Sequence, residues 1–495
     1  MTFEPIPEMI EELPNISGWE SGVEAATDRR EPVFVKRTPL RLDRIQSAFG
    51  VALHMHQPLI LDDGDLHQAR MLGNLQYMME HQHIHGNHDA PVFAWCYTRI
   101  ADFIRGLVDA GRQPRVMLDY SGELLFGLRQ MGRGDILDNL KSITLNDRYW
   151  PHVEWLGTMW GHAVVPSTPV PDVPLHVRAW QQYFAAIFGW EALGRVRGFS
   201  PPEMHLPNHP DVCYEYVRTL RDSGYQWLAV QEHSVEELDG HGLRERYLPR
   251  KLVARNSRGE ELSITALIKT QGSDTKLIGQ MQPFHEAKGQ HPREIKGKRI
   301  PPLVFQISDG ENGGVMMNEF PENYKQVWHQ TGTEGVVGMN GTEYLELLAA
   351  AGIREGDFEP IQPLHQHKIW ERMGKKPNLE RLQQLIEELR RQNHRFNMEG
   401  ASWTNNLSWV HGYENVLDPI NKLSALFHEK IDGHSVDKRS HAYHNALLHL
   451  LTTQTSCYRY WGTQGRWTDY AREICRRGNE ILEHDFTAHR ENAPR

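Results

Sequence analysis

Acidic and imidazole side chains stand next to glycine or proline at several points of the chain, a combination typical of catalytic groups held at strand ends. Asp309 and Glu311 flank one glycine directly after a charge-free apolar run. His54 and His56 close another apolar run, and Glu203 follows a Pro-Pro pair. The ordinary structural use of Asp, Gly and Asn together is a polar turn. The secondary structure predicted around these residues must therefore distinguish a polar turn from an active site.

The stretch 47–58 predicts a β-strand, because its side chains alternate between two faces. One face carries the larger residues, which are Phe49, Val51, Leu53 and Met55. The other carries small residues and the two imidazoles, namely Ala48, Gly50, Ala52, His54 and His56. Small side chains fit the crowded interior of a barrel, and Gln57-Pro58 stops the strand. We therefore expect both histidines at the C-terminal end of a barrel strand.

Further apolar runs predict more strands, most of them followed by a helical pattern. They cover residues 115–120, 152–157, 196–199, 226–231, 262–268 and 301–307. Strands thus alternate with helices over much of the chain, which is the pattern of a parallel barrel or a wound sheet. A glycine-rich phosphate loop after the first strand is absent, which argues against a nucleotide-binding fold.

The chain is predicted to have three parts. Residues 1–46 form an irregular extension with several prolines and mixed charge. Residues 47–345 form the barrel, and residues 346–495 form a helical domain that completes the cleft. Within that domain, amphipathic patterns predict helices over 379–393 and 441–460, the first of them strongly charged on its outer side.

Composition excludes several classes of partner. The 495 residues carry a formal net charge of −10, which argues against nucleic acid or an anionic membrane as the main partner. Four cysteines stand far apart, so neither a disulfide framework nor a zinc knuckle is expected. The sequence has no signal-peptide pattern at its start and no run of about 18 apolar residues. A cytoplasmic protein without a membrane span is the expectation.

Histidine and tryptophan are both abundant, at 28 and 14 residues. Four of the histidines crowd into residues 81–88. On a helix His81 and His85 would share a face, but Gly86-Asn87 indicates a helix end and no acidic ligand is fixed by the spacing. We therefore predict no metal site. Tryptophan faces can stack on sugar rings, although most of these residues are expected to fill the core.

Carboxylates at the ends of separate strands, beside imidazoles and tryptophans, suit the cleavage of a glycosidic bond. In a retaining enzyme one carboxylate attacks the sugar and the second acts as general acid and then base, about 5–5.5 Å away. A purely structural network of buried charges is the alternative, although charges are costly to bury.

The motifs resemble those of glycoside hydrolase family 57. Residues 54–58, His-Met-His-Gln-Pro, are similar to the first conserved region of that family, and residues 154–162 to the second. Residues 198–204, with Pro-Pro-Glu, and residues 309–311, Asp-Gly-Glu, are similar to the third and the fourth. Residues 460–462 are a weaker match to the aromatic region that follows the barrel.

The resemblance implies a (β/α)7 barrel followed by a C-terminal helical domain, no obligatory cofactor, and retaining chemistry on α-glucans or maltooligosaccharides. It makes Glu203 the nucleophile and Asp309 the general acid/base, so that Glu203 must be ionised while Asp309 holds its proton. The residues predicted to bind substrate are His54, His56, Glu154, His162, Glu311 and Trp461.

Two positions depart from the family pattern. Ser200 stands where the family often has tryptophan, and Gly313 stands where it often has an aromatic residue. Three functions are open at this point. The first is an α-glucan hydrolase or glucanotransferase. The second is a metal-dependent polysaccharide deacetylase, which the histidine content favours. The third is a catalytically silent glucan-binding protein, which the altered aromatic positions allow.

Overall fold

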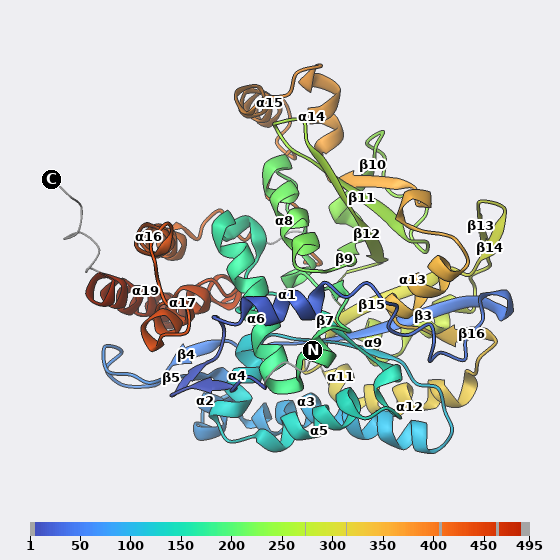
Figure 1. Ribbon diagram of the computed structural model, residues 1–495, viewed down its shortest axis with the longest axis horizontal. Coiled ribbons are helices and arrows are strands. Elements are labelled where there is room, and N and C mark those ends of the chain that lie inside the picture. The colour runs from blue at the N-terminus through green and yellow to red at the C-terminus, as the bar shows by residue number, and fades with distance from the viewer. Residues whose placement is uncertain (1–4, 273, 313, 405–407, 462–464, 487–495) are drawn as a thin grey trace.

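A closed ring of seven parallel strands lies at the centre of the computed structural model (Figure 1). In ring order the strands are β12 (Glu261–Lys269), β15 (Leu303–Asp309), β3 (Ile45–Met55), β6 (Val116–Tyr120), β7 (Val153–Gly157), β8 (Gly198–Phe199) and β9 (Trp227–Gln231). The ring closes where β9 pairs with β12. The structure describes residues 5–272, 274–312, 314–404, 408–461 and 465–486. The predicted (β/α)7 barrel is confirmed.

Helices on the outside of the ring connect successive strands, as a parallel barrel requires (Figure 1). The longer ones are α2 (Asn74–Glu80), α3 (Ala90–Asp109), α4 (Gly122–Gln130), α5 (Gly134–Leu145), α6 (Val173–Phe188), α8 (Pro210–Asp222), α12 (Phe320–Gln330) and α13 (Gly341–Ala350). The shorter ones are α7 (Trp190–Leu193), α9 (Lys276–Gly279), α10 (Gln282–Ala287) and α11 (Gly314–Asn318). Ser121 begins α4 by accepting the Leu124 N–H at 3.2 Å, which is ordinary N-capping.

The two faces of β3 lie in different hydrophobic clusters, as the alternation predicted. Phe49, Val51, Leu53 and Met55 belong to the large cluster between the strands and the surrounding helices. Ala48 and Ala52 belong to the cluster inside the ring, with side chains such as Met117, Leu156, Ala229, Leu267 and Phe305. The interior of the barrel is thus packed with apolar side chains below the polar strand ends.

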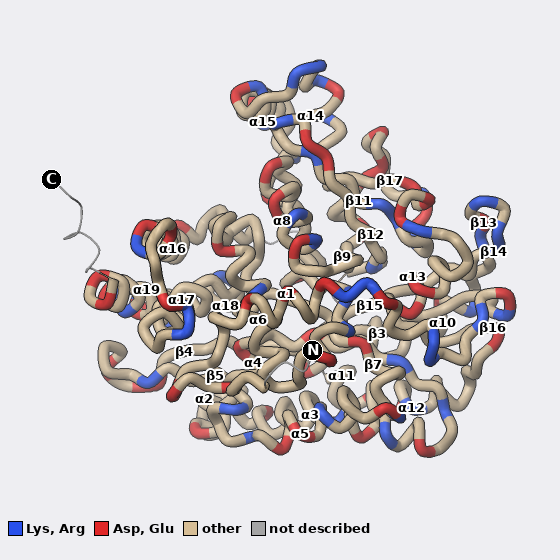
Figure 2. The backbone as a smooth tube through the Cα atoms, viewed as in Figure 1, with Lys and Arg blue, Asp and Glu red and all other residues tan. Residues whose placement is uncertain are grey.

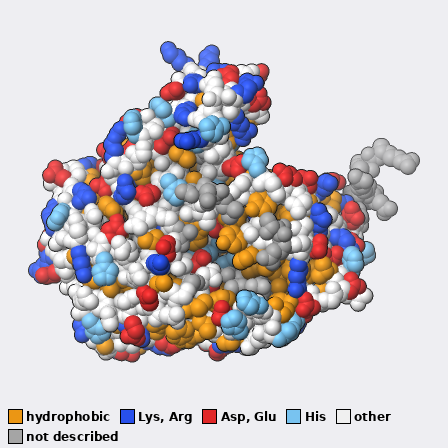
Figure 3. Space-filling model, turned by 180° about the vertical axis from the view of Figure 1, so that it is seen from behind, with side chains coloured by type: hydrophobic (Ala, Val, Ile, Leu, Met, Phe, Trp, Pro, Cys, Tyr) orange, Lys and Arg blue, Asp and Glu red, His pale blue; other side chains and the backbone are white. Residues whose placement is uncertain are grey.

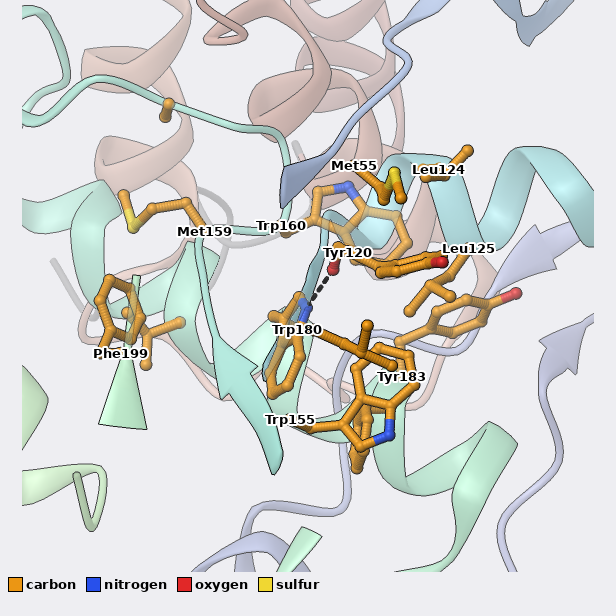
Figure 4. Packing of buried hydrophobic residues seen from close by; sticks show 14 of the residues in the cluster. Met55, Tyr120, Leu124, Leu125, Trp155, Met159, Trp160, Trp180, Tyr183 and Phe199 are labelled. Carbon is orange, nitrogen blue, oxygen red and sulfur yellow. Dashed lines mark hydrogen bonds between the residues drawn. The ribbon is translucent and has the colours of Figure 1, made fainter. Parts of the chain in front are cut away.

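Aromatic residues fill the space between the ring and its helices. Figure 4 shows Trp155, Trp160 and Trp180 packed together beside Tyr120 and Tyr183. The Trp180 indole N–H donates a hydrogen bond of 2.8 Å to the Tyr120 carbonyl, so the polar edge of this buried ring is satisfied.

Most tryptophans therefore serve the core, as expected. The exposed exceptions are Trp95 and Trp461, each with 43% of its surface accessible. Figure 3 shows the rear face of the molecule, where hydrophobic side chains gather near the middle.

Additional strands extend the barrel at its edges. A sheet of β11 (Arg250–Arg255), β17 (Pro360–Pro363) and β10 (Val235–Glu237) continues from β12, and β16 (Gly335–Gly338) pairs with β3. Three small hairpins are β1–β2 (Met9–Ile10, Leu13–Pro14), β4–β5 (Leu59–Leu61, Met71–Gly73) and β13–β14 (Arg293–Ile295, Lys298–Ile300). The segment expected to be irregular before the barrel contains one helix, α1 (Glu20–Thr27).

The C-terminal helices lie in two separate groups (Figure 1). The first group is α14 (Gln366–Met373) and α15 (Leu379–Gln392), which share a small hydrophobic cluster of their own. The second group is α16 (Glu414–Ile431), α17 (His441–Thr453), α18 (Cys457–Tyr460) and α19 (Gly465–Asp485), which join the large cluster around the barrel. Among the described residues, no helix is both long and apolar enough to cross a membrane.

Candidate active site

The predicted polar residues of neighbouring strands meet at one end of the barrel. In the strand pairing, Asp309 of β15 stands opposite His54 of β3, and His54 stands opposite Asp119 of β6. The Gly310 N–H donates to the His54 carbonyl at 2.8 Å and continues this pairing past the end of β15. A Cβ atom on residue 310 would lie 2.1 Å from Met55 Cε, so any larger residue between the two acids would have to displace the Met55 side chain.

Glu203 reaches the same end of the barrel from the turn after β8. This turn covers Pro202–Met204 and follows Pro201. Glu203 has φ of 59° and ψ of 17°, a left-handed conformation that costs a non-glycine residue of order 1–3 kcal/mol. Strain of this kind persists only where the surroundings enforce it, and it concentrates at functional sites. The Glu203 side chain remains 14% exposed, so a ligand can reach it.

Two residues from beyond the barrel hold the Glu203 carboxylate. The Trp403 indole N–H donates to Glu203 Oε2 at 2.7 Å, and the Ser456 hydroxyl donates to Glu203 Oε1 at 3.2 Å. The Trp403 backbone N–H also donates to the Glu203 carbonyl, at 3.1 Å. The Trp403 ring meets the His54 imidazole edge to face, with ring centroids 5.9 Å apart. The segment between α15 and α16 therefore forms one wall of the site.

His54 is the positively charged member of the site. Its Nδ1 atom lies 2.8 Å from Asp119 Oδ2. Burial alone would lower the pKa of His54, but the Asp119 carboxylate, with help from Asp309 and Glu311, raises it to about 10. The Ser200 hydroxyl donates to the same Asp119 oxygen at 2.7 Å. The serine that replaces the expected tryptophan thus supports the ion pair beneath the site.

His56 and His162 stack on each other as neutral rings. Their centroids are 4.3 Å apart, and the His54 ring lies 4.7 Å from that of His162. Each has a hydroxyl partner at 2.7 Å, from His56 Nδ1 to Ser121 and from His162 Nδ1 to Ser456. Burial and the charge of His54 hold the pKa of both rings well below its usual range. Among the described residues, His162 Nε2 is buried and has no hydrogen-bond partner.

The acidic residues of the site influence one another. Burial and the neighbouring Asp309 charge raise the pKa of Glu203 to about 7 and that of Glu311 to about 8. Hydrogen bonds from Trp403 and Ser456 act on Glu203 in the opposite direction. The His56 backbone N–H donates to Glu311 Oε1 at 3.2 Å, while Glu311 Oε2 has no partner in the described part of the chain. Asn312 donates to Asp309 Oδ2 at 3.1 Å.

Glu154 lies apart from this group, which corrects the expectation that it lines the substrate site. Its register places it level with Met117 and Ala52, two residues before His54 along the strands. Its carboxylate accepts the Thr342 N–H at 2.9 Å and the Thr342 hydroxyl, at the start of α13. Burial raises the pKa of Glu154 to about 8. Glu154 therefore joins a strand to a helix inside the protein.

Among the described residues, the ring contacts of Trp461 are with other aromatic residues and not with the catalytic residues. It lies at the end of α18, where its ring stacks on Trp467 with centroids 6.4 Å apart and meets Tyr460 at 4.9 Å. Both Tyr460 and Trp461 are exposed. Its predicted role in substrate binding stays a prediction. Gly313, the second departure from the family pattern, lies outside the described residues.

A chain of polar contacts ties the loop after β7 to the C-terminal helices. His176 Nε2 lies 2.8 Å from Gln454 Oε1, and the Gln454 amide donates to Asp172 at 2.6 Å. The other Asp172 oxygen lies 2.7 Å from His428 Nε2 on α16. Because His162 lies in the connection between β7 and α6 and Ser456 lies three residues after α17, these contacts fix the two segments that carry the hydrogen bond between His162 and Ser456.

Among the described residues, the histidines of this site do not form a group of metal ligands. Nearly parallel stacking directs the ring nitrogens of His56 and His162 to separate hydroxyl partners. In residues 81–88, α2 ends at Glu80, so His81 and His85 do not share a helical face. The described residues hold one group of three possible ligands within 4.8 Å of each other, the partly exposed set Glu11, Glu12 and His441. An exposed acidic pair of this kind is not a site by itself.

Sequence reasoning missed three residues that shape this site. Asp119 stands in a predicted strand, level with His54, so the strand-end rule could have found it. Trp403 and Ser456 follow Glu203 by 200 and 253 positions, and no periodic pattern connects them with it.

This arrangement places acidic side chains and a cluster of imidazoles at the ends of the barrel strands. The chain matches no protein-family model and no curated protein. Among solved structures it is similar to the 4-α-glucanotransferase of Thermococcus litoralis, with 14% identity and a TM-score of 0.53. That match covers 88% of this chain and 60% of the glucanotransferase, so the chain spans well under two thirds of that enzyme.

Two branching enzymes of glycoside hydrolase family 57 are also similar. The one from Thermococcus kodakaraensis has 12% identity and a TM-score of 0.47, with 89% of both chains covered. The one from Pyrococcus horikoshii has 12% identity and a TM-score of 0.48, with 88% of both chains covered. At these identities the likeness concerns the fold alone. The fold is of the family 57 type, as the motifs predicted.

Proposed function

We propose that this protein acts on α-glucans or maltooligosaccharides with retention of configuration, through a covalent glycosyl-enzyme. The observation that carries the proposal is that Glu203, held by Trp403 and Ser456, and Asp309, opposite His54 in the strand pairing, come to the same end of the barrel from β8 and β15. Two carboxyl groups facing each other across one cleft are the machinery of a retaining glycosidase. The family 57 type of fold supports the same class of reaction.

In the first step, a Glu203 oxygen attacks the anomeric carbon and the bond to the leaving sugar breaks. The Asp309 carboxyl gives its proton to the departing oxygen. In the second step, Asp309 takes a proton from water or from a sugar hydroxyl, whose oxygen then displaces Glu203 from the anomeric carbon. Water gives hydrolysis, and a sugar hydroxyl gives transfer.

The surrounding groups prepare Glu203 for attack. Trp403 and Ser456 donate hydrogen bonds that favour its ionised form, and the His54 cation acts in the same sense. Burial and Asp309 oppose them, so the pKa of Glu203 is about 7. His162 Nε2 and Glu311 Oε2 are buried without a partner among the described residues, and they would hydrogen-bond sugar hydroxyls once neighbouring side chains move aside.

Trapping the intermediate tests the nucleophile. The protein is incubated with a mechanism-based fluorinated glucosyl fluoride, digested and analysed by mass spectrometry. We expect the label on Glu203 and no label on the Glu203→Gln variant. A label on Glu311 or any other residue would overturn the mechanism. Binding of maltooligosaccharides without any labelling or turnover would instead favour a silent glucan-binding protein.

Product analysis separates the two outcomes of the second step. Incubation with one pure maltooligosaccharide, followed by chromatography, gives chains longer than the substrate if a sugar hydroxyl resolves the intermediate. Only shorter chains form if water resolves it.

A further inference from the structure

A buried arginine of α3 lies next to the loop that carries Asp309 and Glu311. Figure 2 shows Lys, Arg, Asp and Glu residues spread along the outer helices, α5 and α12 among them. Arg99 of α3 is instead only 1% exposed, and among the described residues it has no ion-pair partner. A guanidinium taken out of water is costly unless other groups meet it. The groups that surround Arg99 therefore indicate its role.

Three backbone carbonyls after β15 accept hydrogen bonds from Arg99. Its Nη2 atom donates to the Gly310 carbonyl at 3.3 Å and to the Met316 carbonyl at 2.9 Å, and its Nη1 atom donates to the Met317 carbonyl at 3.5 Å. Met316 and Met317 lie near the end of α11, and the last carbonyls of a helix have no partner within it. One side chain therefore connects the residue between the two acids with the helix that follows them.

Two aromatic rings lie against the same guanidinium. Arg99 Cζ is 4.6 Å from the centroid of the Trp95 ring and 5.3 Å from that of the Phe320 ring. Trp95 stands one turn earlier on α3, and Phe320 is the first residue of α12. Ring faces attract a cation and leave the donors in the guanidinium plane for the carbonyls. Rings and carbonyls thus stabilise this buried charge in place of a carboxylate.

Gly310 is held through both of its backbone polar groups. Its N–H donates to the His54 carbonyl at 2.8 Å, and its carbonyl accepts from Arg99. The first group belongs to the peptide plane shared with Asp309, and the second to the plane shared with Glu311. Glycine restricts φ and ψ less than any other residue, so these hydrogen bonds limit rotations that a side chain would otherwise limit.

We propose that Arg99 is a positioning residue, which orients Asp309 for proton transfer by fixing the backbone of residues 309–311. The inference rests on the proposed function, in which Asp309 protonates the departing oxygen. A general acid must lie within hydrogen-bond reach of the atom that it protonates. A displacement of about 1 Å can cost about a hundredfold in rate. Because Arg99 donates to backbone carbonyls, it acts through the position of the loop.

Steady-state kinetics on two substrates test this role. Arg99→Met keeps an apolar stem but removes the donors. We expect kcat/KM for a maltooligosaccharide to fall about ten- to a hundredfold, and that for α-glucosyl fluoride to fall less than about threefold, because fluoride leaves without a proton. Arg105→Met is the matched control and should leave both rates unchanged, since Arg105 lies on the same helix and donates to Asn139, Ser142 and Asp102.

Two further variants separate positioning from a loss of folding. Arg99→Lys keeps the charge but presents a single compact ammonium, so its loss on the maltooligosaccharide should be about three- to tenfold. In the Asp309→Asn background, Arg99→Met should lower the remaining maltooligosaccharide activity by less than about threefold, because a residue that acts through Asp309 adds little once that acid is gone. If Arg99→Met does not fold, the same comparisons are made with Arg99→Lys.

Hydrogen exchange, measured by mass spectrometry with fragmentation to single residues, follows the loop without any turnover. We expect the Gly310 amide to exchange at least about tenfold faster in Arg99→Met than in the parent, because its hydrogen bond to His54 opens more often. The amides of β7 should exchange as in the parent, and Arg105→Met should alter neither group.

A parental exchange rate of the Gly310 amide in the folded Arg99 variants would refute the inference. Equal losses on the two substrates, or additive losses in the double variant, would refute it as well and make Arg99 a purely structural residue. A parent protein without turnover and without label on Glu203 would instead refute the proposed function. Exchange of the Gly310 amide would then decide alone whether Arg99 holds the loop.

Discussion

Both ends of the barrel hold buried charges. At one end the charges have partners within the protein, and at the other a cation lacks one among the described residues. At the catalytic end, Glu203 has its hydrogen bonds supplied by Trp403 and Ser456, and the charge of His54 is matched by Asp119 at 2.8 Å. Near the opposite end, Arg197 has no ion-pair partner among the described residues. The first end therefore matches its buried charges within the protein, whereas Arg197 near the opposite end keeps a guanidinium without a carboxylate partner in the described part of the chain.

Glu154 is a buried acidic residue that belongs to neither end of the barrel. Thr342 donates hydrogen bonds to the Glu154 carboxylate, which lies inside the wall of the barrel. Burial alone therefore does not mark a functional residue. The useful distinction is whether the hydrogen-bonding atoms of the group are used up within the protein.

Asp309→Asn should give the largest effect at the catalytic end. Removing the proton donor should lower kcat/KM for maltooligosaccharides by about 10²–10⁴-fold. The loss should be much smaller for α-glucosyl fluoride, because fluoride leaves without a proton. Steady-state kinetics on both substrates measure the difference. Asp222→Asn, an exposed residue at the end of α8, is the matched control and should leave both rates unchanged. Equal losses on the two substrates would make Asp309 a binding residue.

Asp119→Asn should give the next largest effect. The Asp119 carboxylate provides the largest favourable contribution to the His54 cation, so the pKa of His54 should fall from about 10. A hydrogen bond between charged groups is worth about 1.5–3 kcal/mol, so kcat/KM should fall about ten- to a hundredfold. Kinetics at pH 7 and NMR titration of the His54 ring measure the two changes. An unaltered His54 titration would refute the ion pair.

Trp403→Phe should shift a pH profile more than it lowers the maximal rate. Loss of the indole donor removes a hydrogen bond to an ionised carboxylate, worth about 1.5–3 kcal/mol, which raises the pKa of Glu203 by about 1–2 units. Because the nucleophile acts when ionised, the acidic limb of kcat/KM lies near pH 7 and should move to higher pH. Trp409→Phe, a buried tryptophan nearby in the sequence, should leave the limb in place. A limb unmoved by Trp403→Phe would exclude its effect on Glu203.

Glu154→Gln should leave activity unchanged and alter only stability. The pKa of Glu154 is raised to about 8 in the folded protein, so between pH 5 and 8 the folded state binds a proton that the unfolded state has lost. The free energy of unfolding of the parent therefore falls as the pH rises through this range, by up to about 3 kcal/mol. The variant should lack this contribution, which urea unfolding at both pH values can measure. A lower kcat in a variant with an unchanged free energy of unfolding would show that Glu154 acts in the substrate site.

Most of the barrel could be predicted from sequence because its signal is local. The alternation in residues 47–55 assigns Phe49 to the helix-facing side and Ala48 to the interior, and both assignments are confirmed. The error over Glu154 has a physical cause. Alternation correctly indicates that a side chain points inward, but it does not give the height at which the side chain lies inside the barrel.

The C-terminal wall of the site could not be predicted in the same way. Trp403 lies in a segment without helix or strand, where no periodicity exists to read. Its contact with Glu203 depends on how that segment folds back over the barrel, which is a property of the whole chain.

The hydrogen bond from Ser456 to Glu203 has a consequence for the protein during its synthesis on the ribosome. The two residues are separated by 253 positions, and synthesis at about 5–20 residues per second needs roughly 10–50 s to add them. During that interval a growing chain can complete its strands but still lacks the hydroxyl that holds the carboxylate. A nascent chain that has reached Trp403 but not Ser456 therefore has only the indole donor to hold the Glu203 carboxylate.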